Sequence, residues 1–196
     1  MAQEDQLKWD KKYTENEKLL GFREPSPLLE QFYVHASGNR ALDIACGTGR
    51  NTLYLAANGF EVDALDISAV ALQELTQHMQ KATDLTFIHT QLVDLDYYSP
   101  EQTYDLIIQT NFLDRALIPK LAKALNKGGL LIIETYMIDP ENEKKGSNTA
   151  YLLQSNELPS YFDTHYEVLF YDEFWNRGEN YRMCKQGIVV KSRHKS

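Results

Sequence analysis

Short apolar runs alternate with amphipathic helical stretches along most of the chain, which predicts a parallel sheet with crossover helices. The five runs predicted as buried strands are Arg40 to Ala45, Phe60 to Leu65, Leu85 to His89, Tyr104 to Gln109 and Leu130 to Thr135. Two later runs, Tyr166 to Phe174 and Tyr181 to Val190, flank Asn176-Arg177-Gly178 and predict an antiparallel hairpin at the sheet edge.

The helical pattern fills most of the chain between these strands. The predicted helices are Leu7 to Leu20, Leu28 to His35, Thr48 to Ala57, Ser68 to about Lys81, Ala116 to Leu125 and a short one near Ser155 to Phe162. Ser68 is expected to cap its helix, and Asn58-Gly59 and the Asn126 to Gly129 run are expected to end theirs. A polar loop covers Asp139 to Thr149. The chain is therefore read as an α/β, doubly wound fold.

A glycine-rich turn, Gly47-Thr48-Gly49, joins the first predicted strand to the next helix. Glycine lets the backbone approach a ligand that a Cβ would exclude, and the helix start directs free N–H groups at it. Asp66 ends the second strand about twenty positions further on, where an acidic residue can bind ribose hydroxyls. The sequence thus predicts a nucleoside cofactor pocket.

A nicotinamide-binding oxidoreductase is an alternative interpretation, because it also needs a Gly-x-Gly turn and an acidic residue. Its third glycine is expected at position 52, which is Thr52 here. A short-chain reductase also needs Tyr-x-x-x-Lys on a helix, but Tyr181 to Lys185 lies in a predicted strand. Both observations disfavour this alternative.

The chain has 196 residues, of which 43% are hydrophobic, enough for one substantial core. Its formal charge of −8 argues against a nucleic-acid partner. No segment resembles a signal peptide or a membrane span, so we expect a cytoplasmic protein with no membrane association. Cys46 and Cys184 are far apart and expected to stay reduced. No cysteine or histidine spacing predicts a metal site.

The sequence resembles the class I S-adenosylmethionine-dependent methyltransferases over nearly its whole length. Within them it is most similar to the small bacterial tellurite-resistance and thiopurine-type enzymes. The motifs that carry the resemblance are the glycine-rich run Leu42 to Asn51, Asp66-Ile67, Asp94-Leu95, Tyr104 to Ile108, Leu125 to Leu130, and two N-terminal groups, Trp9-Asp10 with Tyr13 and Glu24 to Leu29. They occur in the family's order and at the expected strand ends.

The resemblance implies a Rossmann-like sheet of order 3-2-1-4-5-7-6, with strand 7 antiparallel and an N-terminal helical lid. It also implies a single methyltransferase domain over residues 1–196. The lid would cover residues 1–36, the core residues 37–191 and a tail residues 192–196.

The implied cofactor is S-adenosyl-L-methionine, which leaves as S-adenosyl-L-homocysteine. Asp43 would meet the amino group of its methionine part and Asp66 its ribose hydroxyls, while Asp94 would bind the adenine amine. The cofactor-binding residues implied by the resemblance are Trp9, Tyr13, Asp43, Ala45, Cys46, Gly47, Gly49, Asn51, Asp66, Ile67, Asp94, Leu95 and Thr110.

Structural roles are the alternatives for several of these residues. Asp43 can instead brace the loop, Asp66 can cap the following helix, and Ile67 can be an ordinary core residue. Asp96 competes with Asp94 for the adenine position. The remaining alternatives are that Trp9 and Tyr13 only anchor their helix, and that Cys46 only fills space.

The acceptor is expected under the N-terminal helix, beside Asn111, Phe112, Tyr136 and the Asp139 to Thr149 loop, with Tyr13 as a further candidate. No residue stands out as a catalytic base. The sequence Thr110-Asn111-Phe112-Leu113 differs from the motif of nucleobase amino methyltransferases, which disfavours that acceptor. Asp114 and Arg115 are candidates for an anionic acceptor, although a capping Asp and a surface Arg are favoured.

Together these features predict a methyltransferase that transfers a methyl group to a small molecule by in-line displacement. A non-catalytic S-adenosylmethionine-binding protein is the alternative from another class. We expect a monomer or a weak homodimer.

Overall fold

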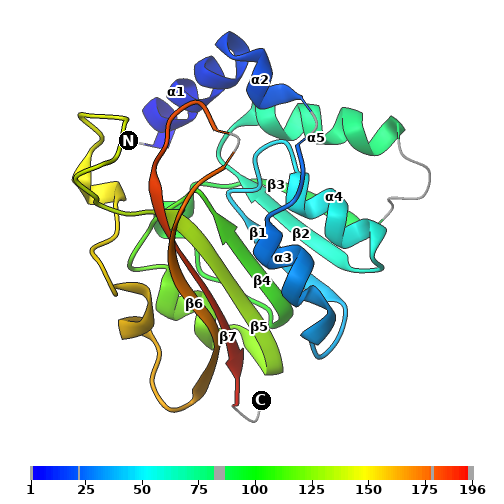
Figure 1. The fold of residues 1–196 in the computed structure, drawn as a ribbon. Helices are drawn as coiled ribbons and strands as arrows, with labels where there is room; N and C mark the ends of the chain where they lie inside the picture. Colours follow the sequence, from blue (N-terminus) through cyan, green and yellow to red (C-terminus); the bar gives the residue numbers. More distant parts are fainter. Residues whose placement is uncertain (1, 22, 82–86, 178, 194–196) are drawn as a thin grey trace.

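The computed structural model describes residues 2–21, 23–81, 87–177 and 179–193. Figure 1 shows a twisted sheet with helices on both faces. The sheet has seven strands in the order β3-β2-β1-β4-β5-β7-β6. The strands are β1 (Arg40–Ile44), β2 (Glu61–Asp66), β3 (Ile88–Leu92), β4 (Tyr104–Thr110), β5 (Leu125–Tyr136), β6 (Tyr166–Trp175) and β7 (Cys184–Ser192).

β1 to β5 pair in parallel, and β7 pairs antiparallel with both β5 and β6. The predicted α/β fold class, the strand order 3-2-1-4-5-7-6 and the reversed strand 7 are therefore confirmed. Within the described segments, no helix combines the length and the apolar character needed to cross a membrane.

Helices cover both faces of the sheet. The α-helices are α1 (Ala2–Glu15), α2 (Glu17–Leu20), α3 (Pro27–Phe32), α4 (Arg50–Ala57), α5 (Ala69–Lys81) and α6 (Ile118–Lys123). The 3₁₀ turns are η1 (Tyr33–His35), η2 (Leu95–Tyr97), η3 (Thr149–Tyr151) and η4 (Leu158–Tyr161). Buried residues of α3, α4 and α5 share one core cluster, and those of α6 belong to the other.

The central strands are buried on both faces, which is why they read as continuous apolar runs. On β4, Leu106 and Ile108 join the cluster with α3 to α5, whereas Ile107 between them joins the cluster with α6. Successive side chains of a strand point to opposite faces, so one short run contributes to both cores. A rigid sheet of this kind fixes the positions of the loops at its carboxyl edge.

The third strand lies later than predicted. We expected Leu85 to His89, but β3 is Ile88–Leu92, and residues 82–86 lie outside the described part of the chain. β3 pairs along β2 from Val62↔Ile88 to Asp66↔Leu92. The four residues after Ile88 are exposed, and three of them are polar, so hydrophobicity does not mark the extent of this edge strand.

The fifth strand begins earlier than predicted. Leu125 already pairs with Tyr104, and after a register shift the pairing resumes at Leu106↔Leu130. The Asn126 to Gly129 run is therefore an irregularity inside β5, and the preceding helix is only Ile118–Lys123. A Cβ at Gly129 would lie 2.9 Å from the Tyr104 carbonyl oxygen, so the backbones approach closely here.

The other helices fall near their predicted positions, with altered ends. The predicted first helix is divided into α1 and α2, and the predicted second helix is α3 continued by η1. The expected short helix near Ser155 to Phe162 is only the 3₁₀ turn η4. Gly59 has φ +85°, and the Ser68 hydroxyl accepts a bond from the Ala71 N–H at 3.2 Å, as expected of a helix end and an N-cap.

Candidate functional site

The glycine-rich turn after β1 forms a sharp backbone corner. Ala45, Gly47 and Gly49 all have positive φ angles, of 54°, 57° and 85°. The Cys46 N–H donates to the Leu65 carbonyl at 2.9 Å, which ties the corner to β2. A Cβ at Gly49 would lie 2.3 Å from Leu75 of α5, so this glycine is required by both its φ angle and its packing. α4 begins at the next residue.

Asp43 lies buried beneath this corner with one oxygen unused. Its Oδ2 accepts a 2.6 Å hydrogen bond from the Thr52 hydroxyl, whereas Oδ1 is buried without a partner. Burial raises the pKa of this carboxyl to about 7. A buried acceptor without a donor is costly, and an ammonium group would satisfy it. The site therefore fits the amino group of a methionine-like ligand.

Asp66 at the end of β2 braces the corner. Its Oδ2 accepts from the Gly47 N–H at 2.7 Å, and its Oδ1 accepts from the Ser68 N–H at 2.8 Å. Burial raises the pKa of this carboxyl, although the backbone hydrogen bonds oppose the shift. Each carboxylate oxygen has two lone pairs, so both can still accept a ribose hydroxyl. The bond from the Ser68 N–H fits the capping role that is the alternative for Asp66, while the bond from Gly47 ties it to the corner. The ribose role of Asp66 stays a prediction.

The N-terminal helix α1 lies over the corner (Figure 1). The Tyr13 hydroxyl is 2.7 Å from the point where a Cβ of Gly47 would lie, and burial raises the pKa of that hydroxyl. Asp10 Oδ1 accepts from the Ser68 hydroxyl at 2.6 Å and from the Val70 N–H at 3.2 Å. The helix is therefore held to the start of α5. Trp9 lies with its ring centre 6.2 Å from that of Tyr13.

Two further predicted cofactor residues, Asn51 and Thr110, are engaged with the protein. The Asn51 amide accepts from the Ser26 N–H at 2.9 Å and donates to the Thr110 hydroxyl at 3.2 Å. This bridge joins the segment before α3 to the end of β4. Both residues therefore border the corner, and their bonds hold the N-terminal segment against the sheet.

The residues predicted near adenine lie after β2 and β3. Ile67 is half-buried. Asp94 Oδ1 accepts from the Asp96 N–H at 3.1 Å and caps η2, while Leu95 is buried in the core. This hydrogen bond fixes the side chain of Asp94 at the turn, which favours Asp94 over Asp96 for the predicted adenine contact. Cys46 is a buried free thiol whose pKa burial raises, which disfavours a thiolate at this position.

The acceptor-side candidates follow β4 and β5. Asn111 has φ +57°, and its Oδ1 accepts a 2.8 Å bond from Lys185 Nζ. The Tyr136 hydroxyl donates to Glu179, and Lys185 Nζ lies 4.7 Å from the centre of the Tyr136 ring. Phe112 is partly buried against the core. Asn111 and Tyr136 are thus brought together through Lys185, whereas Phe112 is not part of this contact.

Lys185 is the centre of an ionic network that sequence reasoning missed. Its side chain is 3% exposed and its Nζ donates to Glu134 at 3.1 Å and to Glu179 at 2.7 Å. The Ser26 hydroxyl donates to the other Glu134 oxygen at 2.9 Å. Burial alone would raise the pKa of Glu179, but Lys185 lowers it overall. The sequence feature that could have revealed this network is the presence of two charged residues, Glu134 and Lys185, within the otherwise apolar strands β5 and β7.

Arg115 and Asp114 have structural roles. Arg115 pairs with Glu157 at 2.7 Å and donates to the carbonyl oxygens of Ala150 and Leu152. Asp114 Oδ1 accepts from the Ala116 N–H at 2.8 Å. The structural interpretation therefore holds for both. Among the residues that the structure describes, no group of three or more His, Cys, Asp or Glu is placed to hold a metal ion.

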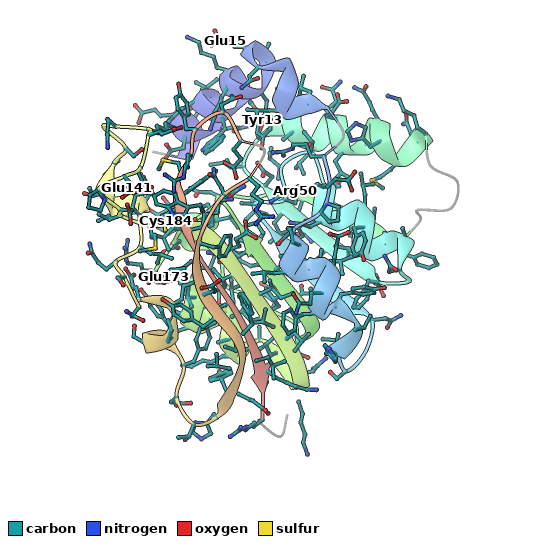
Figure 2. All side chains as sticks on the ribbon, viewed as in Figure 1. Tyr13, Glu15, Arg50, Glu141, Glu173 and Cys184 are labelled. Atoms are coloured by element: carbon teal, nitrogen blue, oxygen red, sulfur yellow. The ribbon has the colours of Figure 1, made fainter. Side chains whose placement is uncertain are left out.

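Two arginines also border the corner, and neither was predicted to act there. Arg50 is the first residue of α4 and Arg23 precedes α3. The Nη2 atom of Arg23 is 3.9 Å from the point where a Cβ of Gly47 would lie. Figure 2 shows Arg50 and Tyr13 at the same end of the sheet. The site thus combines buried carboxylates with cations around one backbone corner.

Known proteins resemble this chain in sequence and in fold. A model of the family described as "Tellurite resistance protein TehB" matches residues 25–196. The curated protein named "Probable S-adenosyl-L-methionine-dependent methyltransferase TehB" from Haemophilus influenzae (strain 10810) is 29% identical over 159 residues. That alignment covers 78% of this chain and 54% of the relative, so the chain spans about half the length of the curated protein.

Solved structures show the same fold. The crystal structure of TehB from Haemophilus influenzae has a TM-score of 0.73 at 24% identity, covering 86% of this chain and 62% of that one. The magnesium protoporphyrin IX methyltransferase from Synechocystis PCC 6803, solved with bound SAH, has a TM-score of 0.69 at 15% identity, covering 97% and 99%. The family model spans most of the sequence, and on that basis the protein belongs to the TehB family of tellurite resistance proteins.

Proposed function

We propose that this chain transfers a methyl group from S-adenosyl-L-methionine to a small-molecule acceptor by in-line displacement. The proposal is supported by membership of the TehB family and by a cradle whose polar groups suit this cofactor. The observation that carries it is the buried, unpartnered Oδ1 of Asp43 directly beneath the glycine corner. An amino-acid ammonium group supplies the missing donor there.

The cofactor would be held between the corner and the lid. Asp43 receives the ammonium group, the Gly47 to Gly49 backbone contacts the methionine part, and Asp66 accepts the ribose hydroxyls. When bound, the cofactor supplies an electrophilic methyl group on a sulfonium. The chain then contributes alignment and exclusion of water, for which the buried Tyr13 on α1 is well placed.

A nicotinamide oxidoreductase fits the corner less well. Thr52 occupies the position of the third glycine, and its hydroxyl donates to Asp43. A glycine there would remove this hydroxyl donor and leave Asp43 with only the backbone bond of residue 52. Thr52 therefore serves the buried carboxylate of Asp43 as a hydrogen-bond donor. A corner that binds a pyrophosphate does not need such a carboxylate.

The acceptor would lie beside Asn111 and Tyr136, at the edge bordered by Lys185. We further propose a cytoplasmic protein that acts without nucleic acid, as a monomer or weak homodimer. The net charge of −8 supports a small acceptor over a nucleic acid.

Calorimetric titration with S-adenosylhomocysteine tests the cradle. We expect binding by the wild type and loss of binding in Asp43→Ala. Asp105→Ala is the matched control, because this carboxylate lies at the start of β4 and contacts Ser37 and Asn126 instead. Equal affinity in all three proteins would contradict the proposal.

Incubation with a methyl-labelled donor and fractionated metabolites then tests turnover. Transfer of the label to a small molecule would support the proposed methyltransferase activity. Cofactor binding with no transfer to any fraction would instead favour the non-catalytic binding protein.

A further inference from the structure

The ionic network around Lys185 presents its charges unequally to solvent. The side chains of Lys185 and Glu134 are only 3% and 8% exposed, whereas that of Glu179 is 34% exposed. The Tyr136 hydroxyl donates to Glu179, which leaves the lone pairs of the hydroxyl oxygen available. A small molecule beside Tyr136 therefore meets a carboxylate and a hydroxyl oxygen rather than the ammonium group.

The ammonium group of Lys185 has its hydrogen-bonding capacity filled. Its Nζ donates to Asn111 Oδ1 at 2.8 Å, to Glu134 Oε1 at 3.1 Å and to Glu179 Oε1 at 2.7 Å. An ammonium group has three N–H donors, so an oxyanion binds it only by displacing one of these partners. Displacement of Glu134 would leave a buried carboxylate unpaired, which is costly.

The two exposed groups keep the protonation states in which they accept hydrogen bonds. Burial and the neighbouring Glu179 raise the pKa of the Tyr136 hydroxyl, so its proton stays directed at Glu179. Burial opposes ionisation of Glu179, but the Lys185 ammonium outweighs this effect and lowers the pKa of the carboxyl below its usual value. Glu179 is therefore an anion at neutral pH, with lone pairs that can accept further donors.

The nearest arginine lies on the other side of the proposed site. Arg23 is within electrostatic reach of Glu179 and Tyr136, but its Nη2 lies over Gly47 at the glycine corner. The Glu179 oxygens are instead engaged by Lys185 and Tyr136. The arginine thus borders the proposed cofactor side, and the carboxylate borders the acceptor side.

The turn between β6 and β7 fixes Glu179 in place. Asn176 Oδ1 accepts from the Met183 N–H at 2.8 Å, which closes the turn. The Arg182 N–H donates to Glu143 at 2.6 Å and so ties the turn to the loop after β5. Figure 1 shows this turn at the end of the sheet where α1 lies. The carboxylate is therefore held beside the proposed acceptor position before a ligand binds, which lowers the cost of binding.

We infer that Glu179 is a specificity-determining residue of the acceptor side, which selects small molecules that carry an N–H or O–H donor and disfavours oxyanions. An ammonium group is the strongest donor of this kind, because its bond to a carboxylate is charge-assisted. A small amine is therefore the favoured class of acceptor. The inference rests on the proposed function, since it names the acceptor class of that same site.

A matched set of benzyl compounds tests this selection. Benzylamine, benzyl alcohol and benzoate share one ring and differ in the charge and the donors of their polar group. Each is titrated into wild type saturated with S-adenosylhomocysteine, and the backbone amide NMR signals of Asn111, Tyr136 and Lys185 report binding at this place. We expect benzylamine to bind about tenfold or more tightly than benzoate.

Glu179→Gln removes the charge and keeps a side chain of the same size. We expect it to weaken benzylamine binding about tenfold or more, because a charge-assisted bond is lost. Binding of benzyl alcohol should change less than about twofold, since the amide oxygen still accepts a hydroxyl proton. Glu167→Gln is the control, because this glutamate lies near the start of β6, away from the turn, and pairs with Arg193.

Three outcomes would overturn the inference. They are benzoate binding as tightly as benzylamine, no binding of benzylamine to wild type, and equal benzylamine affinity in wild type and folded Glu179→Gln. The comparison of ligands on wild type decides the case if the variant does not fold. If wild type binds no S-adenosylhomocysteine, the proposed function fails, and the same titrations without it still test the selection by Glu179.

Discussion

Lys185 on β7 lies directly opposite Tyr136 on β5, and its ammonium nitrogen is 4.7 Å from the centre of the Tyr136 ring. The same ammonium bonds Asn111, Glu134 and Glu179, so one buried cation connects the ends of β4 and β5 with the turn before β7. The acceptor side of the proposed site is therefore built as one unit.

Removing this cation should strongly destabilise the fold. Lys185→Met leaves Glu134 buried without its partner, and we expect a loss of about 3 kcal/mol in the free energy of unfolding. Urea unfolding measures the change, and Lys185→Met combined with Glu134→Gln should recover part of it. Lys11→Met is the control, because its pair with Glu15 is largely exposed and should change stability little. Equal stability of Lys185→Met and wild type would contradict the network.

Asp66 should control cofactor affinity. Asp66→Ala removes the two proposed charge-assisted bonds to the ribose and also the brace on Gly47, so we expect S-adenosylhomocysteine affinity to fall by roughly a hundredfold or more. Calorimetry measures the affinity, and a thermal melt separates lost binding from lost folding. An unchanged dissociation constant in folded Asp66→Ala would remove Asp66 from the site.

Cofactor affinity should rise with pH because of Asp43. Burial raises the pKa of Asp43 to about 7, and an ammonium ligand binds best to the ionised form. We therefore expect binding of S-adenosylhomocysteine to be about thirtyfold weaker at pH 5.5 than at pH 8. Asp43→Asn should flatten this dependence, and a wild-type profile without slope would count against the assigned role.

The same shift has an opposite effect on stability without ligand. In the unfolded chain aspartate titrates near pH 4, so folded Asp43 retains a proton that the unfolded chain loses between about pH 4 and 7. The contribution of Asp43 to stability therefore falls as pH rises through that window and is constant above it. Urea unfolding of wild type and Asp43→Asn from pH 4.5 to 8 measures the difference.

Asp10 should hold α1 against the start of α5. Asp10→Ala removes the bonds to the Ser68 hydroxyl and the Val70 N–H, and a lost cap of this kind costs about 1 kcal/mol. We expect the amide hydrogens of α1 to exchange about fivefold faster, as mass spectrometry of exchanged peptides would detect. Glu15→Gln, at the end of the same helix, is the control. Equal exchange rates of the α1 amide hydrogens in Asp10→Ala and in the control would show that Asp10 does not hold α1 in place.

The sheet was predictable because its strands are buried on both faces. An apolar run such as Ala41 to Ile44 that is followed by a helical pattern is best explained as a buried strand of a parallel sheet. β3 was misplaced because only Ile88 of that edge strand is buried, so apolar character does not mark its extent. The early start of β5 depends on the pairing of Tyr104 with Leu125, a contact between distant residues that no local pattern encodes.

The site was predictable where backbone conformation requires a residue type. Gly47 and Gly49 have positive φ angles, and Asp43 and Asp66 follow from their positions at strand ends. Arg23 and Glu179 were missed because each lies in a connecting segment where charged residues are ordinary. Only the fold brings these side chains to the corner and to Lys185.

The reversal of β7 changes which part of the chain can reach the proposed acceptor side. A parallel strand offers its last residues to that edge, whereas β7 enters the sheet there with its first, Lys185 among them. The segment before β7 adds Glu179, which accepts from the same ammonium. The carboxyl-terminal hairpin therefore supplies side chains to the proposed acceptor side from a part of the sequence far from the glycine corner, so substitutions in the hairpin can change that side without changing the corner's own residues.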